Sequence, residues 1–182
     1  MLNFYKAELV DAESVAKLIN SAYRGESSRK GWTTEADILD GLRTTTAEIG
    51  KIIKRKDAFM LIGVYRDEIV ATICCEWQEL ASQDTVHFGM IAVKPSLQNK
   101  GYGKKMIQAA EAMTLREWRV AGFHMAVISI RHELIAFYER QGYIKTGEFK
   151  NFPENSALWR PKVEGLNLQY LAKLVEVRTL AL

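Results

Sequence analysis

The stretch of sequence that decides the fold runs from Met90 to Lys105 and reads MIAVKPSLQNKGYGKK. Its apolar start predicts the end of a buried strand, and its two glycines, Gly101 and Gly103, open a helix that we expect over residues 101–118. Each glycine costs about 1 kcal/mol relative to alanine inside a helix, so a pair in the first turn needs a reason. One reason is the close approach of a ligand to the backbone. The other is tight packing, with lysines added for solubility.

An anion is the ligand that such a turn suits. At a helix N-terminus several backbone N–H groups have no intrahelical partner, and the helix dipole is positive at that end. Because Gly101 and Gly103 have no Cβ atoms, an anionic oxygen can reach these N–H groups. Three lysines, Lys100, Lys104 and Lys105, add positive charge. The sequence therefore predicts a phosphate or pyrophosphate site at this turn.

Two common phosphate-binding motifs do not match the turn. A P-loop would need glycine where Gln98 stands, and a dinucleotide-binding fingerprint would need a small residue where Met106 stands. The pattern Gln98-x-x-Gly101-x-Gly103 instead resembles the acetyl-coenzyme A motif of the GNAT superfamily of N-acetyltransferases, which reads Arg/Gln-x-x-Gly-x-Gly/Ala.

A second motif lies downstream, after a predicted helix and a predicted strand. Residues 131–143, RHELIAFYERQGY, are similar to the family pattern Asn-x-x-Ala-x-x-Phe-Tyr-x-x-x-Gly-Phe, with Arg131 and Leu134 in place of asparagine and alanine. The order of the other predicted elements also matches, so the resemblance covers nearly the whole chain. It implies a single GNAT-like domain over residues 1–182.

The resemblance implies how acetyl-CoA is held. Backbone amides of the glycine turn would bind the pyrophosphate, and the preceding strand would hydrogen-bond the pantetheine arm as it would an added strand. A backbone N–H within residues 91–93 would face the carbonyl oxygen of the acetyl group. The cofactor-binding residues expected on this basis are Ile91, Ala92, Val93, Gln98, Asn99, Lys100, Gly101, Tyr102, Gly103, Lys104 and Lys105. No metal is expected.

Acetyl transfer from a thioester to an amine needs a group that takes the amine proton and a group that helps the thiolate leave. Tyr138 stands where the family motif places a tyrosine near the cofactor sulfur, so we expect it to be the general acid. The alternative is a core tyrosine, since Leu134, Phe137 and Tyr138 have helical spacing. His87, on the strand that leads into the turn, is the candidate base. The alternatives to it are a strand histidine without a catalytic role, and water relayed by Glu76.

In this superfamily the first two helices and the last hairpin border the acceptor site. The acceptor-binding candidates are Tyr23, Trp32 and Glu35, because aromatic rings beside a carboxylate can hold an ammonium group. Glu35 could instead be an ordinary first-turn charge of a helix that begins near Trp32. Arg24 and Arg160 could instead hold a carboxylate. The identity of the acceptor stays open at this stage.

Together the motifs predict an acetyl-CoA-dependent N-acetyltransferase that acts on a primary amine of a small molecule or peptide through a ternary complex. A different class of function is also compatible with them, a module that binds CoA as a sensor or regulator without turnover. A longer acyl donor is a further alternative within the enzyme class. A monomer and a homodimer are both compatible with the sequence.

The hydrophobic pattern predicts an α/β (α+β) fold, with a mixed, mostly antiparallel central sheet and helices on both faces. One helix is expected after an N-cap at Asp11, and a second is expected to begin at residues 32–35. Further helices are expected over residues 47–54, 101–118 and 133–141. The expected strands are residues 3–9, 58–65, 69–78, 86–93 and 123–130, with a last hairpin that pairs 143–149 with 168–175. Residues 25–31 and 151–165 are expected to be irregular.

Composition limits the partners. The chain of 182 residues has 25 Lys and Arg against 22 Asp and Glu, and this net charge of +3 does not predict the concentrated basic face of a nucleic-acid-binding protein. Cys74 and Cys75 are neighbours in a predicted strand, so they should point to opposite faces without forming a disulfide. No stretch approaches 18 uninterrupted apolar residues, and residues 1–6 lack the apolar core of a signal peptide. We therefore expect a cytoplasmic protein with no membrane partner.

Overall fold

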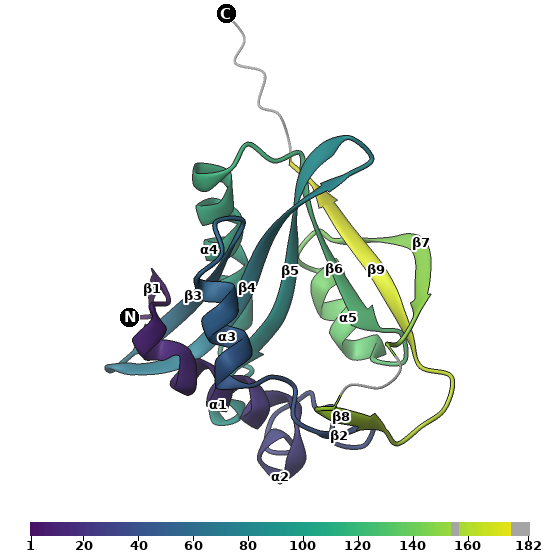
Figure 1. Ribbon diagram of the computed structural model, residues 1–182. Coiled ribbons are helices and arrows are strands. Elements are labelled where there is room, and N and C mark those ends of the chain that lie inside the picture. The colour runs from purple at the N-terminus through teal and green to yellow at the C-terminus, as the bar shows by residue number, and fades with distance from the viewer. Residues whose placement is uncertain (154–156, 176–182) are drawn as a thin grey trace, which may run out of the picture.

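The structure is a computed structural model that describes residues 1–153 and 157–175. Seven of the described strands form one sheet in the order β1-β3-β4-β5-β6-β9-β7 (Figure 1). Within it β5 and β6 run parallel, and the other neighbouring strands are antiparallel. The strands are β1 (Asn3–Lys6), β3 (Ala58–Tyr65), β4 (Glu68–Leu80), β5 (Gln83–Val93), β6 (Gly122–Ile128), β7 (Ile144–Asn151) and β9 (Asn167–Leu174). The predicted mixed, mostly antiparallel sheet is confirmed.

Helices cover both faces of this sheet, as the hydrophobic pattern predicted. One face packs against α1 (Ala12–Tyr23) and α3 (Thr46–Ile53), and the other against α4 (Tyr102–Glu117) and α5 (His132–Glu139). The helices hold to the sheet through apolar stripes, and each fully buried aliphatic side chain contributes about 2 kcal/mol. Single turns form η1 (Leu9–Asp11), α2 (Gly25–Ser28) and η2 (Pro95–Leu97). In the described part of the chain, no helix is long and apolar enough to cross a membrane.

The adjacent cysteines of β4 show the two faces of the sheet. Cys74 is buried among the residues beneath α1 and α3, whereas Cys75 is buried in the core beneath α4 and α5. Both thiols are free. The side chains alternate across the strand, as the sequence predicted.

β5 and β6 diverge after a short parallel pairing. In the described structure three residue pairs join the two strands, and the last pair is His87 with His124. Beyond this pair β6 continues beside β9, and residues 88–93 of β5 continue beside β4. Figure 1 shows the two strands spreading apart toward the end of the molecule that carries α2. One backbone edge of β5 is therefore open at the end of the strand.

A β-bulge bends β5 in this open section. Between the pairs Thr72–Ala92 and Cys74–Gly89, two residues of β5 oppose a single residue of β4. One of the two, Met90, has a left-handed backbone with φ of 48°. Bulges of this kind redirect a strand and its backbone groups, and they are common beside functional sites.

The prediction that a helix begins at residues 32–35 is wrong. This segment is a loop and turn that leads into β2 (Leu39–Gly41), and Glu35 is buried there between Arg24 and Arg131. A threonine followed by acidic residues is a local helix-start signal. The ion pairs of Glu35 with two arginines override this signal. In the segment 25–31, expected to be irregular, α2 forms one helical turn.

Two further expectations need correction. Asp11 precedes α1, but its carboxylate accepts a hydrogen bond from the Glu8 N–H at 2.8 Å and does not cap that helix. Within residues 151–165, β8 (Trp159–Pro161) forms and pairs antiparallel with β2. The last predicted pairing is confirmed, since β7 and β9 are antiparallel neighbours.

Candidate active site

The turn between β5 and α4 presents free backbone N–H groups at the start of a long helix. Gly101 is the N-cap of α4 with φ of 77°, and Asn99 is also left-handed with φ of 60°. Among the described residues, no hydrogen bond takes up the N–H groups of residues 99–104. These donors and the positive end of the helix dipole meet at one place, which is suited to an anion.

The two glycines of this turn are needed for different reasons. A Cβ atom at Gly103 would lie 3.3 Å from Cζ of Phe137 in α5, so this position must stay small for the two helices to pack. A Cβ atom at Gly101 would meet no atom within 4 Å, but its left-handed backbone favours glycine. Tight packing therefore explains Gly103, and the turn itself explains Gly101.

Gln98 joins two segments through its side-chain amide. Its Nε2 donates to the Val93 carbonyl oxygen at 3.1 Å, and its Oε1 accepts from the Trp32 N–H at 2.9 Å. The amide thus connects the end of β5 to the loop after α2. Gln98 positions the turn with one donor and one acceptor of its amide.

A cavity of about 190 Å³ lies over the turn, and we call it the turn cavity. The turn and β5 supply Ile91, Ala92, Val93, Gln98, Asn99, Gly101, Gly103 and Lys104 to its lining. Lys100, Tyr102 and Lys105 do not line it. The Tyr102 ring lies 6.0 Å from the Tyr65 ring, and Lys105 Nζ lies 6.0 Å from the Tyr102 ring centre. The structure thus brings most of the expected cofactor-binding residues around one cavity.

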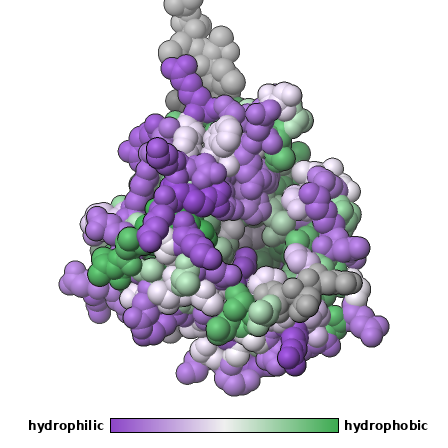
Figure 2. Space-filling view, viewed as in Figure 1, coloured by the Kyte–Doolittle hydropathy of each residue, from purple (hydrophilic) through white to green (hydrophobic). Residues whose placement is uncertain are grey.

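A second cavity, of about 300 Å³, opens where β5 and β6 separate, and we call it the splay cavity. Its walls are residues 87–91 of β5 and 125–128 of β6, and further side chains close it. The other lining residues are Tyr23, Arg24, Glu35, Arg43, Arg131, Leu134, Tyr138, Phe152, Pro153, Trp159, Leu168 and Tyr170. Figure 2, which has the same view as Figure 1, shows a hollow near the middle of the face toward the reader.

The two cavities meet. Five residues line both of them: Tyr23, Ile91, Arg131, Leu134 and Tyr138. Tyr23, the last residue of α1, donates its hydroxyl hydrogen bond to the Ile91 carbonyl oxygen at 3.0 Å. This bond ties the helix to the bulged part of β5 at the junction.

Tyr138 differs from the buried tyrosines around it. The residue is 5% exposed, and its hydroxyl makes no hydrogen bond with the described residues. The hydroxyls of Tyr23 and Tyr143 instead donate to Ile91 and Glu111. Burial raises the pKa of Tyr138, so the hydroxyl keeps its proton near neutral pH. A protonated and unpaired hydroxyl at the junction can donate to a ligand atom.

His87 lines the splay cavity with an uncharged ring. Its Nδ1 lies 3.2 Å from Nδ1 of His124, and burial lowers its pKa to about 4. The imidazole is therefore neutral near pH 7, with a lone pair that can accept a hydrogen bond. The described residues hold no group of three or more His, Cys, Asp or Glu that could bind a metal ion.

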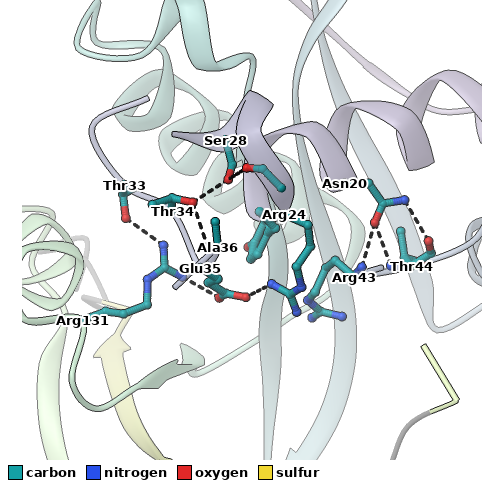
Figure 3. Close-up of polar contacts among 12 residues, drawn as sticks. Asn20, Arg24, Ser28, Thr33, Thr34, Glu35, Ala36, Arg43, Thr44 and Arg131 are labelled. Atoms are coloured by element: carbon teal, nitrogen blue, oxygen red, sulfur yellow. Dashed lines mark hydrogen bonds and ion pairs between the residues drawn. The ribbon is translucent and has the colours of Figure 1, made fainter. Parts of the chain in front are cut away.

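A buried ion-pair network crosses the junction (Figure 3). Arg24 Nη1 donates to Glu35 Oε2, and Arg131 Nη1 donates to Glu35 Oε1 at 2.6 Å. Arg131 Nη2 also donates to Thr33 Oγ1 at 2.7 Å. Arg131, which departs from the asparagine of the family motif, thus holds the loop after α2 against the start of α5.

The expected acceptor-binding residues do not all line the same cavity. Tyr23 lies at the junction, Glu35 lines the splay cavity, and Trp32 lines the turn cavity. Arg160 is exposed on β8 and lines neither cavity.

Arg43 lines the splay cavity and was not indicated by any sequence pattern. Its guanidinium carbon lies 5.7 Å from the centre of the Tyr23 ring. It belongs to the segment between β2 and α3, which has no motif of its own. Only the packing of that segment on α1, where Asn20 bonds the backbone of Arg43 and Thr44, places it here.

Comparison with known proteins identifies the class to which this site belongs. Residues 13–143 match the model of the acetyltransferase (GNAT) family. This match spans more than half of the chain, so the chain belongs to the acetyltransferase (GNAT) family, as its two motifs suggested. Proteins of this family use acetyl-CoA. No curated protein is similar enough in sequence to match the chain.

Solved structures share the fold at low sequence identity. An acetyltransferase of the GNAT family from Streptococcus pneumoniae is 14% identical, with a TM-score of 0.67 over 96% of this chain and 100% of that one. The ribosomal-protein-S18-alanine N-acetyltransferase from Escherichia coli is 13% identical, with a TM-score of 0.66 over 100% of both chains. A chain of the NatC complex bound to Gag peptide and CoA is 14% identical, with a TM-score of 0.66 over 96% and 99%. These likenesses show a common fold.

Proposed function

We propose that this protein is an acetyl-CoA-dependent N-acetyltransferase that acetylates a primary amine of a small molecule or peptide. The observation that carries the proposal is the junction of two cavities at the unpaired hydroxyl of Tyr138. One cavity ends at the free amides of residues 99–104, and the other has room for a small acceptor. An amine and a thioester that meet at the junction would react by direct attack in a ternary complex.

The chain has groups that fit acetyl-CoA. The N–H groups of residues 99–104, with the charge of Lys104, would hold the pyrophosphate, and the open edge of β5 at residues 91–93 would hold the pantetheine arm. Acetyl-CoA supplies the activated acetyl group and a thiolate leaving group. A backbone N–H near Ile91 would donate to the carbonyl oxygen as that oxygen gains negative charge.

Tyr138 and His87 would carry out the two proton transfers of the reaction. The Tyr138 hydroxyl would donate to the leaving sulfur, whose thiol has an ordinary pKa of about 8.5. His87 would accept the amine proton through water. Because burial lowers the pKa of His87 to about 4, it is a weak base for an alkylammonium of pKa about 10.4. The free amine is therefore the form that would enter the reaction.

A thermal-shift experiment with acetyl-CoA tests the cofactor assignment. A ligand at 100 times its Kd stabilises the folded state by about 2.7 kcal/mol, which raises Tm by several degrees. Gly101→Glu should abolish the shift, because it places a carboxylate at the anion site. The control is Gly147→Glu, since Gly147 is also left-handed, at φ of 83°, and lies on β7. Absence of any shift for the wild-type chain would contradict the proposal.

Release of the CoA thiol then separates an enzyme from a CoA-binding module. The chain is incubated with acetyl-CoA and a panel of primary amines, and free thiol is followed over time. Amine-dependent release is the result expected of an N-acetyltransferase. Binding without release for every amine is the result expected of a sensor or regulatory module.

A further inference from the structure

We infer that the acceptor carries a carboxylate as well as its amine, as a free amino acid does, and that Arg24 and Arg43 bind this carboxylate in the splay cavity. The inference rests on the proposed function, because it names the class of acceptor for that same site. It is carried by the charge of the cavity lining.

The described lining of the splay cavity has more positive than negative charge. It contains the three arginines 24, 43 and 131 against a single carboxylate, that of Glu35. The other titratable groups of the lining are His87 and the tyrosines 23, 138 and 170. Burial lowers the pKa of His87 to about 4 and raises the pKa values of Tyr23 and Tyr138, so these three groups are uncharged near pH 7. His124, which contacts His87, is also neutral, since burial lowers its pKa to about 4. The lining therefore carries an excess of two positive charges.

Glu35 is not available to an ammonium group. Arg24 occupies its Oε2 atom and Arg131 its Oε1 atom, and the residue is 5% exposed. The sequence-based expectation that Glu35 holds an ammonium thus has no free oxygen to support it. A cationic acceptor without an anionic group would enter a cavity that repels it.

Donors for an anion remain in the same lining. Among the described residues, no carboxylate pairs with the guanidinium of Arg43, which stacks near the Tyr23 ring. The Nε atoms of Arg24 and Arg131 are buried without a hydrogen-bond partner. Buried arginines ordinarily have their donors satisfied, and a guanidinium matches a carboxylate with two parallel hydrogen bonds. A bound carboxylate would supply the missing negative charge.

The cofactor does not account for these two arginines. Arg24 and Arg43 line the splay cavity and are absent from the lining of the turn cavity, where the pyrophosphate would bind. Arg131 lines both cavities and is already held by Glu35 and Thr33. Arg24 is also paired with Glu35 through Nη1, and its Nε is the donor without a partner. The charge of Arg43, together with the Nε donor of Arg24, is therefore directed at the acceptor.

Cavity size and apolar walls also fit a small amino compound. A volume of about 300 Å³ is at the lower end of small-molecule sites. Phe152 and Trp159 line the cavity, and they offer apolar surface to the side chain of such a compound. With its amine at the junction and its carboxylate toward Arg43, an amino acid would meet each part of the lining with matching chemistry.

The test compares matched acceptors. Each of the twenty standard amino acids is assayed beside its primary amide, with acetyl-CoA present and free thiol as the readout. We expect kcat/KM to be at least tenfold higher for the preferred acid than for its amide. Arg43→Gln should raise KM for that acid at least tenfold, leave KM for the amide within about twofold, and leave the acetyl-CoA thermal shift unchanged. The control Arg119→Gln removes an exposed arginine outside both cavities and should behave as wild type.

The outcomes separate this inference from the proposed function. If acids and amides react equally well, or if none of the acids is acetylated, the inference is overturned, while thiol release with the amides or with another amine of the panel keeps the proposed function. If Arg43→Gln weakens acids and amides alike, the carboxylate assignment is also overturned. If acetyl-CoA does not bind at all, the proposed function itself is contradicted.

Discussion

Arg131 Nη1 donates a hydrogen bond to Glu35 Oε1 at 2.6 Å, although the two residues lie 96 positions apart in the chain. The bond connects the start of α5 to the loop after α2, beside the junction of the two cavities. Arg24 binds the other oxygen of the same carboxylate. One buried carboxylate therefore ties the loop that borders both cavities to α1 and to α5, beside the bonds of Thr33 to Arg131 and of Trp32 to Gln98.

Replacement of Glu35 by glutamine should destabilise the fold. The change would leave Arg24 and Arg131 buried without their counter-charge, and breaking a buried ion pair from one side costs about 3 kcal/mol or more. Urea denaturation measures the loss as a lower midpoint. The matched control is Glu26→Gln, which removes an exposed partner of Arg29 and should lower the midpoint far less. Equal midpoints for the two variants would show that the network does not hold the loop.

Lys104→Glu should weaken acetyl-CoA binding without lowering stability. Lys104 lines the turn cavity in the first turn of α4, where a carboxylate is favourable to the helix dipole but repels a pyrophosphate. Reversal of one exposed charge near an anion weakens the binding free energy by about 1 to 2 kcal/mol. We therefore expect the Kd for acetyl-CoA to rise about tenfold at low salt. Calorimetric titration measures Kd, and Lys56→Glu, at an exposed residue outside the cavity, is the control. An unchanged Kd for Lys104→Glu would remove this lysine from the cofactor site.

Tyr138→Phe should lower kcat by about 10²-fold and leave acetyl-CoA affinity near that of the wild type. The variant keeps the buried ring and loses only the hydroxyl at the junction. The control is Tyr143→Phe, which loses the hydrogen bond to Glu111 and should affect stability more than turnover. Single-turnover rates with saturating acetyl-CoA separate the two effects. Normal turnover by Tyr138→Phe would show that this residue is only part of the core.

The two neighbouring histidines of β5 and β6 should make stability fall at acidic pH. Burial lowers the pKa values of His87 and His124 to about 4, from an ordinary value of 6.5. Between pH 4 and 6.5 the unfolded chain therefore binds protons that the folded chain does not. The stability that neutral histidines contribute is present above pH 6.5 and is lost as the pH falls toward 4.

Urea midpoints between pH 4.5 and pH 7 test this dependence. His124→Gln should flatten the fall in the midpoint, whereas His132→Gln, at an exposed histidine, should keep the wild-type slope. If both variants follow the wild-type curve, protonation of the buried pair does not limit stability in this range.

Local rules were enough to predict the turn and the layers. The left-handed N-cap at Gly101 is a requirement of the backbone itself, and the spacing of Gly101 and Gly103 marks this turn in the sequence. The stripe of α1 and the alternation at Cys74 and Cys75 follow equally local periods. The long helices and the central sheet could therefore be predicted from short stretches of sequence, whereas the expected role of Tyr138 came from the resemblance to the family motif.

The burial of Glu35 between two arginines and the presence of Arg43 in the splay cavity could not be predicted in this way. Glu35 has a helix-start signal beside it, but its burial depends on arginines from α1 and α5. Arg43 reaches the cavity because Asn20 of α1 holds the backbone of the segment before α3. Such placements arise from contacts between distant segments, and no spacing in the sequence reports them.

Acetyl transfer at the cavity junction is tested most directly by a single-turnover experiment. The chain is loaded with acetyl-CoA that is radiolabelled in the acetyl carbonyl, then mixed with the panel of primary amines, which includes peptides, the amino acids and their amides. We predict that the label moves to an amine, with one CoA thiol released for each acetylated amine. If the label stays on CoA with every amine although acetyl-CoA is bound, the chain is a CoA-binding module and the proposed activity is contradicted.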